Sequence, residues 1–227
     1  MGAEPATRDE SSGEDNEHGG VPGATLALTM STIAFSVCFA AWVINAVLVT
    51  FVVGNGLFKF DAGQVGWLMA LPILTGAVAR VPLGLLTDKL GGRVVLLVVM
   101  LLVAVPLTLL SFAQSYVHFV LCSLGFGLAG GSFAVGVGYV ASWYGKAKQG
   151  TALGVFGMGN AGAALTTLIA PTLLVAFTQN KANLEGWRML PRVYAGLVAG
   201  TAVLFFVLTK TRKAVTTGPP RSLGERL

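Results

Sequence analysis

A single arginine stands inside an apolar stretch of this chain, and its chemistry is that of an anion-binding group. Arg80 lies in LPILTGAVARVPLGLL, eight residues before Asp88. In a helix this spacing places it about 12 Å from the end of an apolar span. A charge at that depth costs from about 2.5 to more than 10 kcal/mol and usually faces a bundle interior or a water-filled path. The alternative is a long side chain that reaches the headgroups at the membrane surface.

Two features of the surrounding sequence favour an anion site at this arginine. First, it belongs to a row of residues spaced four apart, which share one helical face and leave space beside the guanidinium. The row is Pro72, Gly76, Arg80 and Gly84. Second, every acidic residue lies near a chain end or in a loop between apolar runs. Because a buried cation without a counter-charge is unstable, we expect it to bind a mobile anion.

A second stretch, ALGVFGMGNAGAALT at residues 152–166, surrounds an asparagine with four glycines. At about 100° per residue, Phe156, Gly157 and Asn160 share one face of a helix. We therefore expect Gly157 to leave room for an anion beside the Asn160 amide. Gly154 and Gly162 lie on roughly the opposite face and are expected to allow close packing of helices. A plain hydrogen bond between helices is the alternative role for Asn160.

The elements that must hold these residues are membrane helices. The chain is 54% hydrophobic and 11% charged, with a mean hydropathy of +0.75, whereas soluble domains carry about 25% charged residues. Six apolar runs are long enough to cross a bilayer core of about 30 Å, and they lack the alternation of membrane β-strands. We predict an all-α integral membrane protein with six transmembrane helices near residues 26–53, 64–86, 94–113, 117–142, 151–177 and 192–209.

Two charged segments flank the predicted six-helix bundle, which occupies residues 25–210. Residues 1–24 hold six acidic residues and one arginine, and this composition predicts a disordered acidic tail without the features of a signal peptide. Residues 211–227 are basic and are predicted to begin a central linker. Of the 15 basic residues, Arg80 is inside a span, ten lie on the side of both ends, and four lie opposite: Lys59, Lys181, Arg188 and Arg192. This bias predicts cytoplasmic termini in a plasma (inner) membrane.

Other classes of function find little support. Cys38 and Cys122 fall in separate spans and define no disulfide. The spans hold no cluster of metal-ligating residues, and neither a metal nor another cofactor is expected. GGSFA at 130–134 lacks the last glycine of a serine-nucleophile motif and has no histidine close enough to act as base, so an enzyme is not expected. The net charge of +5 reflects the basic side of the membrane, and no nucleic-acid partner is expected.

The loop after the second span resembles a signature of the major facilitator superfamily. In GLLTDKLGGR, the pattern G-x3-D-R/K-x-G-x-R/K is matched by Gly84, Asp88, Lys89, Gly91 and Arg93. Its physical sense is a tight turn opened by glycine, with one carboxylate and two basic groups that can bond to helix ends and exchange partners. Simple anchoring by positive charge is the alternative. The position after the second of six spans implies the amino-terminal half of such a transporter.

Within that superfamily, the chain from about residue 28 to 227 resembles the nitrate/nitrite porter (NarK-type) family. The fifth-helix signature G-x2-G-x-G-N-x-G is matched by Gly154, Gly157, Gly159, Asn160 and Gly162. The resemblance implies that Arg80 binds nitrate or nitrite and that Asn160 lies beside the anion. It also implies that Phe133 packs against the anion and that Gly157 and Gly159 line the site. A guanidinium suits this substrate because its planar fork of donors can bond two oxygens of a small planar anion.

The resemblance further implies transport by alternating access, in which two six-helix halves enclose the anion. This chain matches one half, so the site would need a carboxyl-terminal half or a second copy of the chain. Another small-anion transporter, a truncated fragment that does not transport and an accessory membrane subunit are the alternatives. Proton symport and nitrate/nitrite exchange both stay open. The spans lack a carboxylate, which favours exchange, whereas TGAVARVPLGLLTDKLGGR resembles the nitrate–proton type.

Overall fold

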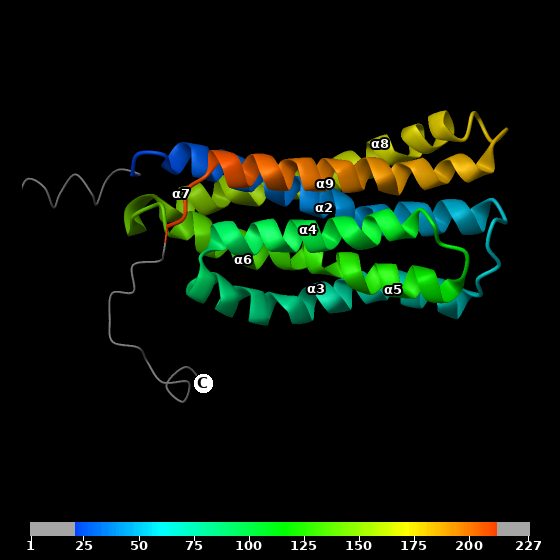
Figure 1. Cartoon of the computed structure of the whole chain (residues 1–227), viewed down its shortest axis with the longest axis horizontal. Helices are drawn as coiled ribbons and strands as arrows, with labels where there is room; N and C mark the ends of the chain where they lie inside the picture. Colours follow the sequence, from blue (N-terminus) through cyan, green and yellow to red (C-terminus); the bar gives the residue numbers. More distant parts are fainter. Residues whose placement is uncertain (1–20, 213–227) are drawn as a thin grey trace, which may run out of the picture.

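The computed structural model describes residues 21–212 and contains six helices long and apolar enough to cross a membrane, as predicted. The predicted tail at 1–24 and linker at 211–227 lie almost entirely outside the described residues. Figure 1 shows the spans side by side along one axis. They are α2 (Ala24–Gly54), α3 (Ala62–Leu90), α4 (Gly92–Leu110), span four (Tyr116–Ala141), span five (Lys146–Phe177) and span six (Leu184–Leu208).

Three of the spans are not single α-helices. Span four consists of α5 (Tyr116–Gly127), the 3-10 turn η1 (Leu128–Gly131) and α6 (Ser132–Ala141). Span five consists of α7 (Lys146–Gly157), η2 (Met158–Asn160) and α8 (Ala161–Phe177), and span six of η3 (Leu184–Arg188) and α9 (Met189–Leu208). Spans five and six begin earlier than the apolar runs suggested, because polar first turns are helical too.

Local sequence explains where the best-defined helices start. Asp61 accepts a hydrogen bond from the Gln64 backbone N–H at 2.8 Å, and the Gln64 side chain accepts one from the Asp61 N–H at 3.1 Å. This reciprocal capping begins α3. Gly91 alone joins α3 to α4 with φ +85°, a backbone conformation that favours glycine. The signature at residues 84–93 therefore does contain a tight glycine turn.

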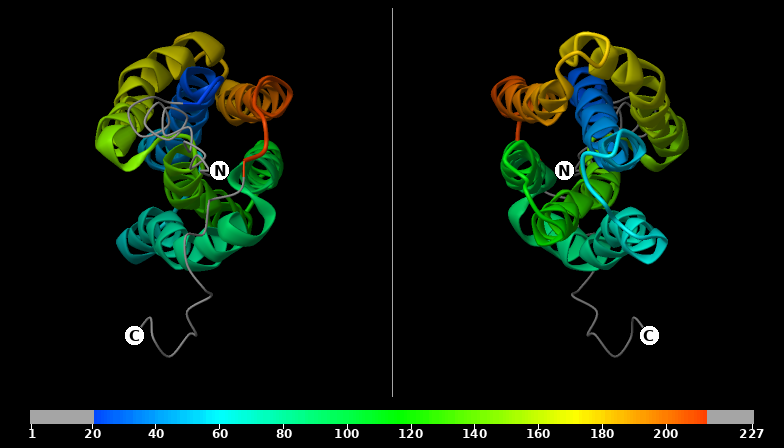
Figure 2. Two further views of the ribbon diagram at one scale, coloured as in Figure 1. Left: turned by 90° about the vertical axis from the view of Figure 1, so that its left-hand side faces the viewer. Right: turned by 90° about the vertical axis from the view of Figure 1, so that its right-hand side faces the viewer.

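Seen end on, α3 and span five lie at two outer edges of the bundle (Figure 2). Helix α2 packs against α8, α9 and α6, while α3 packs against α5, η1 and α6 on the other side. In the most apolar windows of α3 and of span five only 22% of residues are buried, against 44–56% in the other spans. These two spans flank α2 and α6 and present the largest uncovered surface to lipid or to another membrane segment.

Both ends of the described chain lie at the same end of the bundle (Figure 1). We call this the terminal end; it also carries Gly91 and residues 142–145. The opposite end carries residues 55–61, 111–115 and 178–183. Its core is aromatic, with the Phe119 ring stacked on Trp187 at 6.0 Å and Phe58 5.1 Å from Phe119. Which end faces the cytoplasm remains a prediction from the charge bias.

Candidate functional site

Arg80 lies on α3 with its side chain tied to span four. Its Nε donates to the carbonyl oxygen of Gly130, in the 3-10 turn η1, at 3.3 Å. The residue is exposed. Within residues 21–212, the sole ion pair joins Arg188 to Glu185, so no described carboxylate neutralises the Arg80 guanidinium. The terminal nitrogens of Arg80 keep their donors for another acceptor, which is the geometry that an anion site requires.

Glycines bring α3 close enough to span four for this bond. A Cβ added to Gly76 would lie 2.9 Å from the carbonyl oxygen of Gly127 and 3.3 Å from the Gly130 Cα. One added to Gly127 would lie 2.8 Å from the carbonyl oxygen of Pro72. The helices therefore approach backbone to backbone two turns or less from Arg80. In the row of four, Pro72 and Gly76 are buried, whereas Gly84 meets open space.

A polar contact fixes α3 where proline interrupts its hydrogen bonds. Pro72 has no N–H for the carbonyl of Leu68, four residues earlier. The Asn45 side-chain amide of α2 donates to that carbonyl at 2.7 Å. The Ser123 hydroxyl of α5 in turn donates to the Asn45 oxygen at 3.4 Å. Asn45 and Ser123 are buried, so three helices are joined at Leu68, about three turns before Arg80.

Phe133 belongs to an aromatic cluster next to the Arg80 contact. It is 37% exposed, and its ring lies 5.4 Å from Phe35 and 5.9 Å from Phe156. Phe35 and Phe156 stack on each other at 4.8 Å and are fully buried. The exposed face of Phe133 can therefore wall an anion site, while its other neighbours hold the ring in place.

Sequence reasoning missed two aromatic residues of α2 that support this cluster. Phe35 forms its base, and Trp42 lies against Gly130, with Cε2 3.7 Å from an added Cβ. Trp42 Nε1 is buried without a hydrogen-bond partner among the described residues. The available signal was the spacing of Phe35, Phe39 and Trp42, which places them along one face of a helix.

Some glycines of span five pack against α2 and others face open space, and the two groups differ from those expected from the sequence. A Cβ on Gly162 would lie in the position of the Ser36 backbone, 1.9 Å from its carbonyl oxygen, so Gly162 does pack against α2. Gly159, predicted to line the anion, packs there too, 2.3 Å from Phe35 Cδ1. Gly154, predicted to pack, meets no atom within 4 Å. Within the described residues Gly159 therefore packs and Gly154 does not, and the roles expected of both at the site stay predictions.

The buried face of span five explains the positions of Gly159 and Gly154, because Phe156 is buried and on a helix Gly159 lies about 60° from it and Gly154 about 160° from it. The 3-10 turn η2 adds a rotation that affects Asn160 and Gly162. Residues 158–160 advance by about 120° each instead of about 100°. Phe156, Gly159 and Gly162 lie on the buried face, three residues apart. Asn160 is consequently exposed, and Phe156 does not share its face. Gly157 meets nothing within 4 Å, so open space does exist one turn before Asn160.

Contacts link Arg80 to span five through span four. Arg80 bonds to Gly130, Phe133 follows three residues later, and Phe133 packs against Phe156 of α7. Asn160 lies one turn beyond Phe156 but contacts neither Arg80 nor Phe133 by hydrogen bond or ring packing. Arg80, Phe133 and Asn160 are all exposed and lie on three different spans. We call these three residues together the strip.

One residue of the signature at residues 84–93 forms a hydrogen bond to another span. Arg93 of α4 donates from Nε to the carbonyl oxygen of Phe206 at 3.1 Å, in the last turn of α9. Its guanidinium also lies 4.1 Å from the Phe206 ring centroid. A basic group at the carboxyl end of a helix satisfies unpaired carbonyls there. Asp88 and Lys89 are exposed and have no ionic partner in the described part of the chain.

A separate groove between α2 and α8 has a volume of about 520 Å³ and opens toward the opposite end. Val43, Val47, Pro171 and Leu174 give it apolar walls, and Lys181 is its one cationic lining residue. None of the predicted anion-binding residues lines this groove.

Among residues 21–212, no group of three or more His, Cys, Asp or Glu residues could hold a metal ion.

The sequence also matches a described protein family. The family model named Major Facilitator Superfamily aligns with residues 30–225. Among solved structures, a bacterial homologue of the human lysosomal transporter Spinster, in an inward-facing and occupied conformation, superposes with a TM-score of 0.74 at 16% identity. The superposition covers 91% of this chain and 48% of that one. At this identity the likeness concerns the fold alone.

Two curated relatives are closer in sequence. A probable nitrate/nitrite antiporter, NarK1, of Thermus thermophilus is 37% identical over 204 residues, which cover 88% of this chain and 46% of the relative. A probable nitrate transporter, NarT, of Staphylococcus haemolyticus is 32% identical over 180 residues, with coverage of 79% and 44%. The chain thus spans about half the length of the curated relatives it matches.

Proposed function

We propose that this chain, which belongs to the Major Facilitator Superfamily, acts as the amino-terminal half of a transporter that carries nitrate or nitrite by alternating access. The superfamily consists of transporters rather than enzymes, and the six spans make the chain a multi-pass membrane protein. The names of the two curated relatives support nitrate or nitrite as substrate. The plasma membrane, with both termini in the cytoplasm, is the location that we propose.

The main support for this proposal is the position of Arg80, whose guanidinium has no carboxylate partner in the described part of the chain. Its Nε bond to Gly130 orients the guanidinium, and its remaining donors face no described carboxylate. Two of them can bond two oxygens of a trigonal anion. Phe133 would wall the site, and Asn160 would donate an amide N–H once the halves close. Gly157 would leave room for the anion. A second half, either a carboxyl-terminal domain or another copy of this chain, would cover the open strip.

Transport is tested in proteoliposomes that contain the purified chain, alone and together with the carboxyl half of the Thermus relative. We expect labelled nitrate to enter in at least one arrangement and unlabelled nitrite to compete. Competition by chloride or sulfate as strong as that by nitrite would instead favour another small-anion transporter. No uptake in either arrangement would favour a fragment or an accessory subunit.

The site assignment is tested by Arg80→Lys in whichever arrangement transports. Lysine keeps the charge but loses the planar fork, so uptake at limiting nitrate should fall at least about tenfold. Arg192→Lys at the opposite end, where Arg192 packs on Phe112, is the matched control and should leave uptake unchanged. Equal uptake by the Arg80→Lys and wild-type proteins would contradict the assignment.

A further inference from the structure

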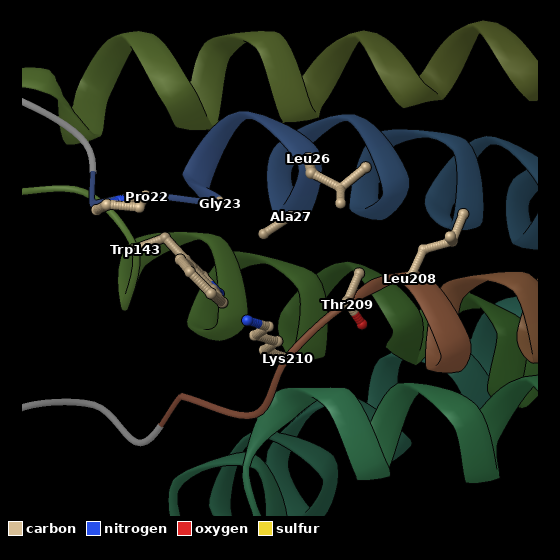
Figure 3. A pocket seen from close by; sticks show the side chains of 8 residues that line it. All are labelled: Pro22, Gly23, Leu26, Ala27, Trp143, Leu208, Thr209 and Lys210. Carbon is tan, nitrogen blue, oxygen red and sulfur yellow. The ribbon is translucent and has the colours of Figure 1, made fainter.

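Three tryptophans bury their indole N–H without a hydrogen-bond partner in the described part of the chain: Trp42, Trp143 and Trp187. Trp143 lines a cavity of about 290 Å³ at the terminal end, between the start of α2 and the residues that follow α9 (Figure 3). Trp187 belongs to the aromatic core at the opposite end. Trp42 differs from both because it lies in the middle part of α2, beside the backbone to which Arg80 is bonded.

Gly130 packs against both the backbone of α3 and the ring of Trp42. A Cβ added to Gly130 would lie 3.3 Å from the Gly76 Cα and 3.7 and 3.8 Å from Trp42 Cε2 and Cζ2. Gly130 is buried, and its carbonyl oxygen accepts a hydrogen bond from Arg80 Nε at 3.3 Å. The indole ring therefore packs against the residue whose carbonyl orients Arg80.

The local structure of span four makes this packing contact important. Gly130 belongs to the 3-10 turn η1, in which backbone hydrogen bonds are less well aligned than in an α-helix. Glycine also has no side chain that could fix its own position. The direction of the Gly130 carbonyl therefore depends on the helices that touch it. Helix α3 carries Arg80 itself, so Trp42 is the contact that comes from a different helix.

Helix α2 is itself fixed close to this contact. Asn45, one turn after Trp42, donates to the Leu68 carbonyl of α3 at 2.7 Å. The two side chains lie three residues apart and so share a face of α2. Trp42 is thus a well-anchored support and not a ring that is free to move away from Gly130.

The same face of α2 also reaches the aromatic part of the strip. The Trp42 ring lies 5.1 Å from Phe39, which lies 4.4 Å from Phe35. Phe35 in turn lies 5.4 Å from Phe133. Consecutive aromatic contacts along α2 therefore connect the residue that orients the cation with the ring that is expected to wall the anion.

We propose that Trp42 is a positioning residue for anion recognition by Arg80. Its ring holds the Gly130 carbonyl, and that carbonyl sets the direction of the guanidinium fork. Because Trp42 Nε1 has no described partner, the support comes from the shape of the ring and not from a hydrogen bond. A planar anion bonded through two oxygens needs a fixed fork, whereas a spherical anion such as chloride does not. Trp42 therefore contributes to the preference for nitrate or nitrite over chloride.

The identity of the anion rests on the proposed function, whereas the positioning of Arg80 does not. The first test therefore follows the Arg80 Nε–H by nuclear magnetic resonance of the full-length chain in detergent micelles, with its signal assigned by its loss in Arg80→Lys. Exchange of this hydrogen with water should become about three- to tenfold faster in Trp42→Leu, because the bond that protects it is loosened. Trp42→Phe keeps a smaller ring and breaks no described hydrogen bond, so it should give an intermediate rate.

Two controls separate a local effect from general loosening. Arg93 Nε, which donates to a carbonyl of α9 at 3.1 Å, is measured in the same sample and should exchange at an unchanged rate. Trp67→Leu removes an indole that is 61% exposed on α3 and should leave the Arg80 exchange rate unchanged.

A second test measures recognition in whichever arrangement transports. Trp42→Leu should raise the nitrate concentration for half-maximal uptake about tenfold, with a smaller effect on the maximal rate. Chloride should compete with nitrate more strongly than in the wild-type protein. Trp67→Leu should change neither quantity.

Several results would overturn the proposal. Equal Arg80 Nε–H exchange in the wild-type chain and in Trp42→Leu would remove the positioning role. Faster exchange at both Arg80 and Arg93 would mean that the variant loosens the whole bundle. Faster exchange at Arg80 alone, with unchanged discrimination between nitrate and chloride, would remove the role in recognition. The exchange rates decide the positioning role even if the wild-type assembly takes up no nitrate, a result that would count against the proposed function alone.

Discussion

Spans four and five are both rich in glycine and both change to a 3-10 turn near their middle, yet they occupy opposite environments. In the most apolar window of span four 56% of the residues are buried, against 22% in span five. Gly127, Gly130 and Gly131 of span four all meet atoms of α3. In span five, Gly154 and Gly157 meet nothing within 4 Å, whereas Gly159 and Gly162 touch α2.

This difference teaches that glycine density does not by itself identify a substrate site. In span four glycine allows backbone contact with the helix that carries Arg80. In span five the same residue type serves packing at two positions and leaves an uncovered surface at three others, Gly150, Gly154 and Gly157. The side of span five on which Phe156 is buried decides which glycines pack, and the 3-10 turn adds a rotation for the residues that follow it, such as Gly162.

Gly162→Ala tests the packed part of span five and should have the largest effect. The added methyl group would overlap the Ser36 backbone, 1.9 Å from its carbonyl oxygen, and a helix backbone cannot yield as a flexible side chain can. We expect a loss of about 1–3 kcal/mol or more of unfolding free energy, measured by denaturant titration in detergent micelles.

The matched control for this change is Gly154→Ala in the same span. Its methyl group would enter open space, and alanine favours the helix over glycine by about 0.5–1 kcal/mol. Stability should stay the same or rise slightly. Similar losses in the two variants would mean that the two faces of span five do not differ as the structure indicates.

Asn45→Leu tests how much the buried hydrogen bonds among α2, α3 and α5 stabilise the bundle. The change removes the donor to the Leu68 carbonyl and the acceptor for Ser123. A loss of about 1–2 kcal/mol in unfolding free energy is expected, since such bonds are modest in membranes but an unpaired carbonyl is costly. The same denaturant titration measures it.

A second change distinguishes the hydrogen bond to the Leu68 carbonyl from the packing of the Asn45 side chain. Pro72→Ala restores a backbone N–H that can bond to Leu68 within α3. In that background Asn45→Leu should cost clearly less than in the wild-type chain. An equal loss with and without Pro72 would show that Asn45 stabilises the bundle by packing and not by satisfying the carbonyl.

The spans could be predicted from sequence because apolar length alone identifies them. All six were found, with ends that differ by up to eight residues where first turns such as Lys146–Gly150 and Leu184–Arg188 are helical. The turn at Gly91 could be predicted too, because few other residues tolerate its positive φ. Both depend on local chemistry, which a single sequence contains.

The arrangement around the candidate site was less accessible to sequence reasoning. The uncompensated charge of Arg80 was visible because acidic residues are absent from the spans. The bond to Gly130 and the support from Phe35 depend on which helices meet, and periodicity does not encode that. The face of Asn160 was assigned by assuming a regular helix, an assumption that η2 breaks, whereas Gly159 was placed at the site by the family resemblance.

Gly157→Ala gives the smallest effect on stability and the sharpest test of the open part of span five. Nothing lies within 4 Å of the added methyl group, so unfolding in detergent should shift by no more than about 0.5–1 kcal/mol, toward higher stability. If the anion occupies this space in the completed transporter, the same methyl group should reduce nitrate uptake at limiting substrate, and Gly154→Ala should not. Unchanged uptake in both variants would show that the open space at Gly157 is not part of the anion site. A residue other than Gly157 would then have to line the site beside Arg80.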